Sequence, residues 1–138
     1  MFMMARRLRV VLAEAPHHIT QRGVDRSVVF LTDGDRQTYL GLLKENLHPA
    51  GVRVLGWCLM TNHVHLLLVP ETAHSLALVL RRVHGRYAQY FNVRGGRGGY
   101  LWQNRYFACS AGGGYLWRGV RSFGADTRRG GGGGGGAG

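Results

Sequence analysis

Two strand-like runs lie next to each other in the middle of this chain, with only two residues between them. Residues 52–60 read VRVLGWCLM, residues 63–69 read HVHLLLV, and Thr61 and Asn62 connect them. Parallel strands need a crossover of about a dozen residues or more, whereas a two-residue connection joins antiparallel neighbours. The sequence therefore predicts a β-hairpin here, and every other segment has to be placed around it.

A strand pattern and a helix pattern precede the hairpin. Residues 17–23, HHITQRG, alternate and finish on a turn glycine, which predicts a strand. Residues 32–51 place apolar side chains at three- and four-residue spacings behind a polar pair suited to an N-cap, which predicts an amphipathic helix. Pro49 and Gly51 are expected to end that helix.

A second helix and a last strand are predicted after the hairpin. Residues 71–92 have an apolar face and an arginine-bearing face, as in an amphipathic helix. A glycine-rich, basic loop within residues 93–107 then leads to a short strand or extended segment. The order strand, helix, strand, strand, helix, strand predicts an α+β fold of the ferredoxin-like, split βαβ type, with an antiparallel sheet and both helices on one face.

The end of the chain has a different composition. Residues 111–138 show little periodicity, are rich in glycine and arginine, and include the unbroken run Gly130–Gly136. Glycine loses much conformational entropy on ordering and has no side chain to bury. We therefore expect one domain over residues 1–110 and a degenerate, disordered tail over residues 111–138.

The charge of the chain favours a polyanionic partner. The sequence has 18 Lys plus Arg against 7 Asp plus Glu, and all of these cations except Lys44 are arginine. The planar guanidinium group binds phosphate oxygens in pairs, which suits nucleic acid, although a GC-rich genome would also favour arginine. No apolar run approaches the roughly 20 residues of a membrane span. Cys58 and Cys109 are expected to be reduced thiols in a cytoplasmic, nucleoid-associated bacterial protein.

Two histidines stand one residue apart at the start of the second hairpin strand. His63 and His65 should point to the same face of the sheet, and Val64 to the other. Neutral imidazoles placed in this way can chelate one metal ion, and protonated ones can bind a phosphate. The spacing alone is also typical of inert, hydrogen-bonded strand residues. The surrounding motifs therefore have to decide whether the pair is a binding site.

Five motifs in register resemble one family of proteins. The segments are HHITQRG, FLTDGD, CLMTNHVHLL, a helix ending YAQYFN, and GYLWQNR, and together they run from about His17 to Phe107. In this order they resemble the REP-associated tyrosine transposases, within the wider insertion-sequence-200-like HUH transposases. One such motif is weak evidence, whereas five in the family's order are specific.

The resemblance implies a reaction on single-stranded hairpin DNA. In the family the paired histidines bind a divalent ion, Mg²⁺ or Mn²⁺, which polarises the scissile phosphate. A tyrosine on a C-terminal helix attacks phosphorus and forms a 5′-phosphotyrosine, so that the strands are rejoined without ATP. The resemblance also implies a homodimer.

Carried onto this sequence, the resemblance makes His63 and His65 the metal ligands. An aromatic residue after the glycine loop is implied to stack on a base, although such a residue is as often part of the core. The candidate DNA-binding residues, phosphate contacts first, are Arg22, Arg94, Arg97, Arg105 and Trp102.

The sequence departs from the family after the motif YLWRGVR. Ser122 stands where the family has its tyrosine nucleophile, and Asp126, four residues later, stands where a third metal ligand is expected. Gly124 between them weakens a helix. Tyr115 is a weak substitute, because seven helical residues displace it by roughly 10 Å. The abrupt change into arginine and glycine suggests a frameshift, which an Arg-Tyr…Asn-Pro string in a neighbouring reading frame would support.

Two functions therefore stay open at this stage. The first is a nuclease and strand transferase that acts in DNA transposition. The second is a catalytically inactive remnant that binds hairpin DNA or RNA without a nucleophile. An unrelated metallohydrolase ranks last, since Glu71 is the only acidic residue close to the histidine pair in sequence.

Overall fold

The structure is a computed structural model that describes residues 11–110, and its centre is a four-stranded antiparallel sheet. The strand order across the sheet is β2-β3-β1-β4. The predicted hairpin is present, and the first strand of the chain lies between its second strand and the last strand. The strands are β1 (His17–Arg22), β2 (Val52–Leu59), β3 (His63–Pro70) and β4 (Phe107–Ser110).

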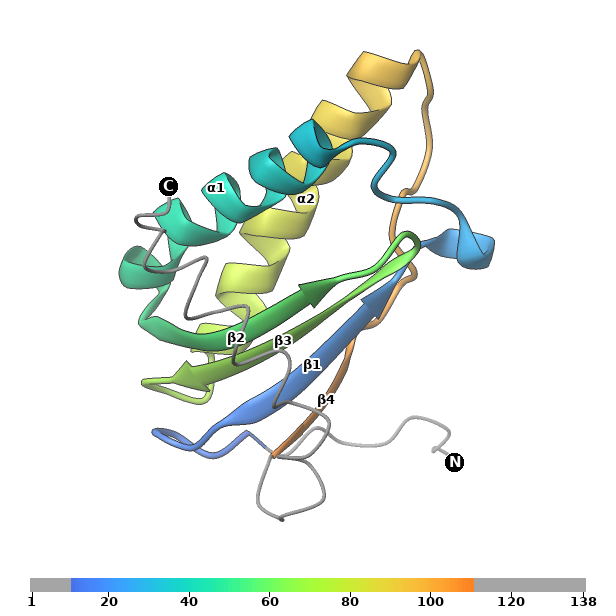
Figure 1. Ribbon diagram of the computed structural model, residues 1–138. Helices are drawn as coiled ribbons and strands as arrows, with labels where there is room; N and C mark the ends of the chain where they lie inside the picture. Colours follow the sequence, from blue (N-terminus) through green and yellow to red (C-terminus); the bar gives the residue numbers. More distant parts are fainter. Residues whose placement is uncertain (1–10, 111–138) are drawn as a thin grey trace.

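Both helices lie on the same side of this sheet (Figure 1). They are α1 (Asp33–Ala50) and α2 (Ser75–Gly95), and a short 3₁₀ turn, η2 (Val24–Arg26), follows β1. The element order and the sheet order confirm the predicted α+β, ferredoxin-like architecture. Within residues 11–110, no helix is long and apolar enough to cross a membrane.

The sequence predicted both ends of α1, but not the position of Pro49 within the helix. Thr32, the first residue of the polar pair, is the N-cap and forms a reciprocal capping box with Asp35. Gly51 ends the helix with a left-handed φ of 73°. The prediction that Pro49 also ends the helix was wrong. Pro49 lies inside the last turn, where its missing N–H costs one helical hydrogen bond at most.

Helix α2 begins later and ends later than predicted. Its expected start, Glu71, instead donates its backbone N–H to the Gly51 carbonyl at 2.8 Å, which holds that segment against the end of α1. The helix begins at Ser75 and continues to Gly95, and Gly96 adopts a φ of 66°. The additional C-terminal turn is anchored to α1 by the contact of Arg94 described below.

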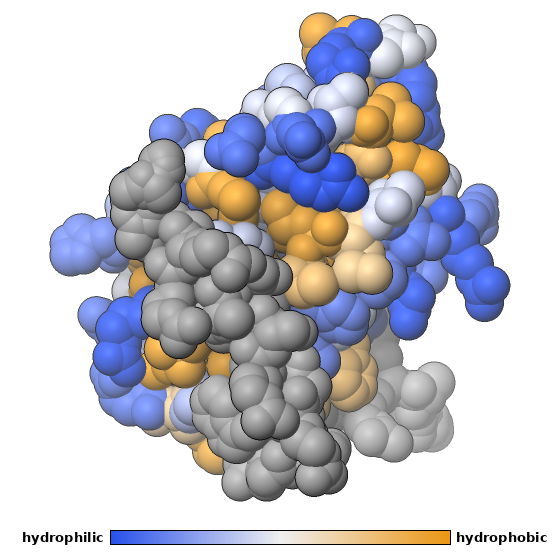
Figure 2. Space-filling model, in the orientation of Figure 1, coloured by the Kyte–Doolittle hydropathy of each residue, from blue (hydrophilic) through white to orange (hydrophobic). Residues whose placement is uncertain are grey.

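The core between the sheet and the helices is built around aromatic rings. Phe30, Tyr39 and Tyr87 are almost fully buried and pack edge to face or tilted, with ring centroids 5.4 to 5.6 Å apart. On the visible face, hydrophobic residues gather between the helical layer and the sheet, and hydrophilic residues lie on the projecting ends (Figure 2). The helix-facing side of the sheet contributes the buried residues Ile19, Val64, Leu66 and Leu68.

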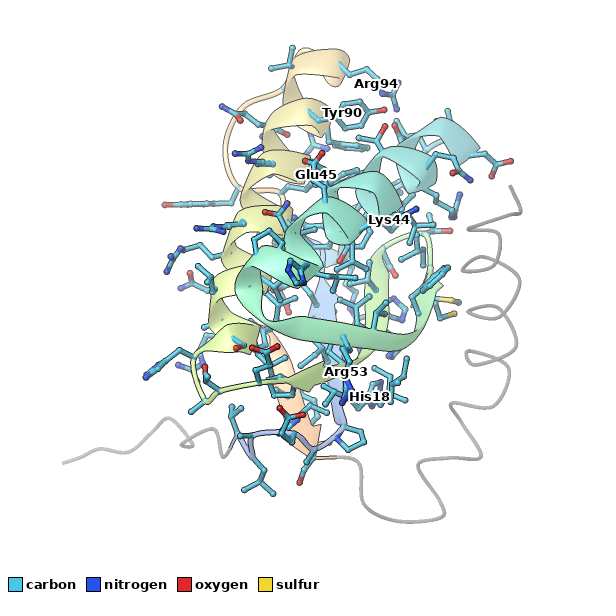
Figure 3. All side chains as sticks on the ribbon, turned by 90° about the vertical axis from the view of Figure 1, so that its left-hand side faces the viewer. His18, Lys44, Glu45, Arg53, Tyr90 and Arg94 are labelled. Atoms are coloured by element: carbon cyan, nitrogen blue, oxygen red, sulfur yellow. The ribbon has the colours of Figure 1, made fainter. Side chains whose placement is uncertain are left out.

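A buried carboxylate joins the two helices at their outer ends. Asp35 is fully buried and accepts hydrogen bonds from the Leu31 N–H at 2.7 Å and from the Tyr90 hydroxyl at 2.8 Å. Arg94 donates to both of its oxygens, at 3.0 and 2.6 Å. Tyr90 and Arg94 both lie on the C-terminal part of α2, beside the start of α1 (Figure 3). One side chain thus caps α1 and holds α2 to it.

Burial by itself raises the pKa of the Asp35 carboxyl, but the donors from Leu31, Tyr90, Arg94 and Thr32 outweigh it and lower the pKa below its usual value. The ionised Asp35 carboxylate therefore stabilises the folded state fully at pH values above its unfolded pKa of about 3.9. This contribution is lost as the pH falls through the lower pKa of the folded state.

We predict that Asp35→Asn lowers the free energy of unfolding at pH 7 by about 2 kcal/mol. Urea unfolding at pH 7 and pH 3 measures this, and the difference between wild type and variant should shrink at pH 3. An equal difference at both pH values would contradict the role of the charge.

Candidate active site on the open face of the sheet

The predicted histidine pair lies on the face of the sheet opposite to the helices. Val64 is fully buried toward the helices, so His63 and His65 on either side of it point the other way, and both are partly exposed. Their ring centroids are 4.9 Å apart with an interplanar angle of 81°. The prediction that the two imidazoles share one face is confirmed.

The end of β1 brings a guanidinium group to the same place. Arg22 is the register partner of His63 across the β1–β3 ladder, and its side chain is exposed. Only glycine fits the turn after it, because a Cβ on Gly23 would lie 2.3 Å from the Ser27 carbonyl oxygen. The Gly23 N–H also donates to the Asn62 carbonyl at 2.9 Å. The cation therefore stands beside the histidines, next to a turn that is hydrogen-bonded to the hairpin.

The hairpin turn determines how His63 is oriented. The Nδ1 atom of His63 lies 2.8 Å from Asn62 Oδ1, an atom that can only accept. Nδ1 must therefore carry the proton, which leaves a lone pair on Nε2. Asn62, one of the two turn residues that identified the hairpin in the sequence, is thus also the partner of its first histidine.

A third imidazole, which sequence reasoning missed, lies behind His65. The Nε2 atom of His18 is 3.0 Å from His65 Nδ1, and the two rings are nearly parallel with centroids 5.1 Å apart. The Thr20 hydroxyl lies 3.3 Å from the same Nδ1 atom. The alternation of residues 18, 20 and 22 in the first strand placed these side chains on one face, but only the β1–β3 register brings them to His65. Figure 3 shows His18 on the sheet, away from the helical layer.

The histidines on this face are neutral at pH 7. Burial lowers the pKa of His65 to about 4, and the neighbouring His18, His63 and Arg22 add to the effect. Burial and the charge of Arg22 lower the pKa of His63, and burial lowers the pKa of His18. Neutral imidazoles are the form that binds metals, whereas a phosphate bound to protonated histidines would require more acidic conditions.

The two Nε2 atoms fit the ligands of a metal ion. Within residues 11–110, neither His63 Nε2 nor His65 Nε2 has a hydrogen-bond partner, while both Nδ1 atoms are bonded from behind. No group of three His, Cys, Asp or Glu side chains in this part of the chain is arranged to hold a metal. The pair therefore provides two ligands, and further oxygen ligands, such as water or phosphate, would have to complete the site.

Two of the predicted DNA-binding residues have contacts inside the fold. Trp102 packs on His84 with ring centroids 4.6 Å apart, and its indole N–H donates to the His84 carbonyl at 3.1 Å. These contacts correspond to the core position considered for this residue. Arg94 binds Asp35, a contact that the sequence analysis did not anticipate. Phosphate binding by Arg94 and base stacking on Trp102 stay predictions.

The other predicted residues lie in loops or outside the described part of the chain. The Arg97 guanidinium lies 5.8 Å from the centre of the Phe91 ring, at the end of α2. Arg105 is exposed in the segment before β4, and that segment is tied to the site where the Gln103 N–H donates to the Arg22 carbonyl at 2.9 Å. The remaining candidates lie outside residues 11–110, namely Tyr115, Ser122 and Asp126.

A comparison with known protein families identifies the family to which this fold and histidine pair belong. The family model described as "Transposase IS200 like" matches residues 13–118, which include the whole sheet, both helices and the histidine pair. This chain belongs to the IS200-like transposase family. Its family function is therefore DNA transposition, and the resemblance of the five motifs is confirmed. A comparison with curated proteins gave no match.

Solved structures of transposases have the same fold. One is a REP-associated tyrosine transposase bound to a REP hairpin, with a TM-score of 0.66 and 15% identity over 84% of this chain and 67% of the other. Another is a transposase from Deinococcus radiodurans R1, with a TM-score of 0.60 and 16% identity over 88% of this chain and 96% of the other. At these identities the likeness concerns the fold.

The effect of the Arg22 charge on the pKa values of the two histidines can be tested. We predict that Arg22→Ala raises the pKa of both His63 and His65 toward the ordinary histidine value, because it removes a cation that opposes protonation. NMR titration of the histidine ring resonances measures both values. Arg81→Ala, which removes an equal charge from exposed α2 surface, is the matched control and should leave them unchanged. Equal titration curves for wild type and Arg22→Ala would refute the placement of the Arg22 charge beside His63 and His65.

Proposed function

We propose that this transposase-family chain binds single-stranded hairpin DNA and presents one phosphodiester to His63, His65 and Arg22. The observation that carries the proposal is the pair of neutral imidazoles, each with an unpaired Nε2 within residues 11–110, beside an exposed guanidinium group. The net charge of +11 supports a polyanionic substrate. The solved relative bound to a REP hairpin supports a hairpin as the DNA element.

Each of these side chains would contribute separately to the reaction. His63 and His65 would hold a divalent cation, Mg²⁺ or Mn²⁺, and when bound it would supply Lewis-acid polarisation of a non-bridging phosphate oxygen. Arg22 would bind another non-bridging oxygen and offset the negative charge that develops on the phosphoryl group. Asn62 would keep His63 in the tautomer that a metal requires.

Cleavage would also need a nucleophile. In the proposed reaction a tyrosine oxygen forms a bond to phosphorus, the bond from phosphorus to the 3′ oxygen breaks, and the tyrosine proton is transferred to solvent while the leaving oxygen becomes a 3′ hydroxyl. The product is a 5′-phosphotyrosine, and attack by a 3′ hydroxyl reverses the step and rejoins strands.

A second function is favoured by one observation in the sequence. The family's tyrosine position is occupied by Ser122, and a serine without an activating base is a poor nucleophile. The alternative is therefore a protein that binds hairpin DNA or RNA at the same face without cutting it. The two functions share the binding site and differ in the covalent step.

A covalent adduct assay separates the two functions. Wild-type protein is incubated with Mn²⁺ and a single-stranded oligonucleotide that carries a hairpin and flanks from the source genome, and adducts are resolved on a denaturing gel. An adduct that is lost in His63→Ala but kept in His74→Ala, an exposed histidine outside the site, would show strand cleavage. Hairpin binding without an adduct, with an adduct gained in Ser122→Tyr, would show the inactive form. Absence of hairpin binding by wild type would overturn both.

The phosphate contact of Arg22 is tested by affinity. We predict that Arg22→Ala weakens hairpin binding by roughly tenfold at low salt and makes binding less sensitive to salt, because one phosphate contact is lost. Fluorescence anisotropy at several salt concentrations measures both effects. Arg81→Ala should weaken binding much less. A similar loss in both variants would mean that only the total charge matters.

A further inference from the structure

His18 lies in the HHITQRG motif and within the residues that the family model matches, but neither gives it a role in this site. It lies on β1, two residues from Thr20, and its ring lies nearly parallel to that of His65, with an interplanar angle of 25°. Its Nε2 atom faces His65 Nδ1 at 3.0 Å, so it approaches the side of the ring that faces away from the proposed ligand atom. It is therefore placed to act on His65 and not on the substrate.

The hydrogen bond between the two rings has two arrangements with different consequences. If His65 Nδ1–H donates to His18 Nε2, the single proton of neutral His65 is on Nδ1, and its Nε2 has a lone pair. If His18 Nε2–H donates instead, the proton of His65 is on Nε2, where it blocks a metal. The tautomer of His18 thus decides whether His65 can be a ligand.

The first arrangement would give His65 the same tautomer as its neighbour His63. His63 has an acceptor, Asn62 Oδ1, 2.8 Å behind its Nδ1 atom. His65 has two potential acceptors behind its Nδ1 atom, His18 Nε2 and Thr20 Oγ1. On both residues the Nδ1 side is bonded and the Nε2 side is not, within residues 11–110. Both ligands would then be held in the same tautomer by an acceptor at the rear.

We propose that His18 is a positioning residue that accepts the Nδ1–H of His65 and so presents His65 Nε2 to the divalent cation. This inference rests on the proposed function for the metal, but the tautomer of His65 can be observed without any metal. The hydrogen bond to His18 also restricts rotation of the His65 ring, so the direction of the Nε2 lone pair is set together with its availability.

The test combines ring spectroscopy with cation binding. Long-range ¹H–¹⁵N correlation spectra of the metal-free chain at pH 7.5 report the tautomer of His65, and titration with Mn²⁺ alone gives its affinity. We expect His65 to be protonated on Nδ1 in wild type and mixed in His18→Ala, and the Mn²⁺ dissociation constant of His18→Ala to rise about tenfold or more. His18→Gln, whose side-chain oxygen can accept in place of Nε2, should return the affinity to within about threefold of wild type.

The controls separate this inference from the metal site itself. His74→Ala removes an exposed histidine elsewhere and should change neither readout, and circular dichroism confirms that each variant is folded. Wild-type His65 protonated on Nε2, or equal Mn²⁺ affinity in wild type and His18→Ala, would overturn the role of His18. If His63→Ala binds Mn²⁺ as tightly as wild type, the proposed metal site at His63 and His65 is refuted. The tautomer spectra then still show whether His65 donates its Nδ1–H to His18.

Discussion

The pairing register between β1 and β3 is the constraint on which the rest of the molecule depends. It sets Arg22 opposite His63 and Thr20 opposite His65, and it brings His18 diagonally onto His65. A slip of β1 by one residue would turn Ile19 toward the open face and His18, Thr20 and Arg22 toward the helices. The same register thus builds the core on one side of the sheet and the candidate site on the other.

Contacts at the hairpin end of the sheet hold this register in place. The turn after β1 is bonded to the hairpin through Gly23 and Asn62, and the Val29 N–H donates to the Thr61 carbonyl at 2.8 Å. On the helix side, the Tyr87 hydroxyl donates to the Val29 carbonyl, which links the same loop to α2. The histidines therefore stand on backbone held from two directions, as a site that must present ligand atoms without rearrangement requires.

Much of the fold could be predicted because its signals are local. The two-residue connection identified the hairpin, and the polar pair before residue 34 together with Gly51 delimited α1. The shared face of His63 and His65 followed from strand periodicity. The contacts of His18, Trp102 and Arg94 could not be predicted, because each depends on residues that are distant in sequence, namely His65, His84 and Asp35. Register and helix packing create such contacts, and no pattern within one segment encodes them.

The most direct measurement is a crystal structure of the chain soaked with Mn²⁺, read by anomalous scattering. An anomalous peak at coordination distance from both His63 Nε2 and His65 Nε2, on the open face beside Arg22, is the predicted result. Such a peak would establish the metal site on the open face, where the proposed function places the phosphodiester. A peak located elsewhere, or no peak at the pair while other sites are occupied, would contradict the assignment of this face as the metal and DNA site.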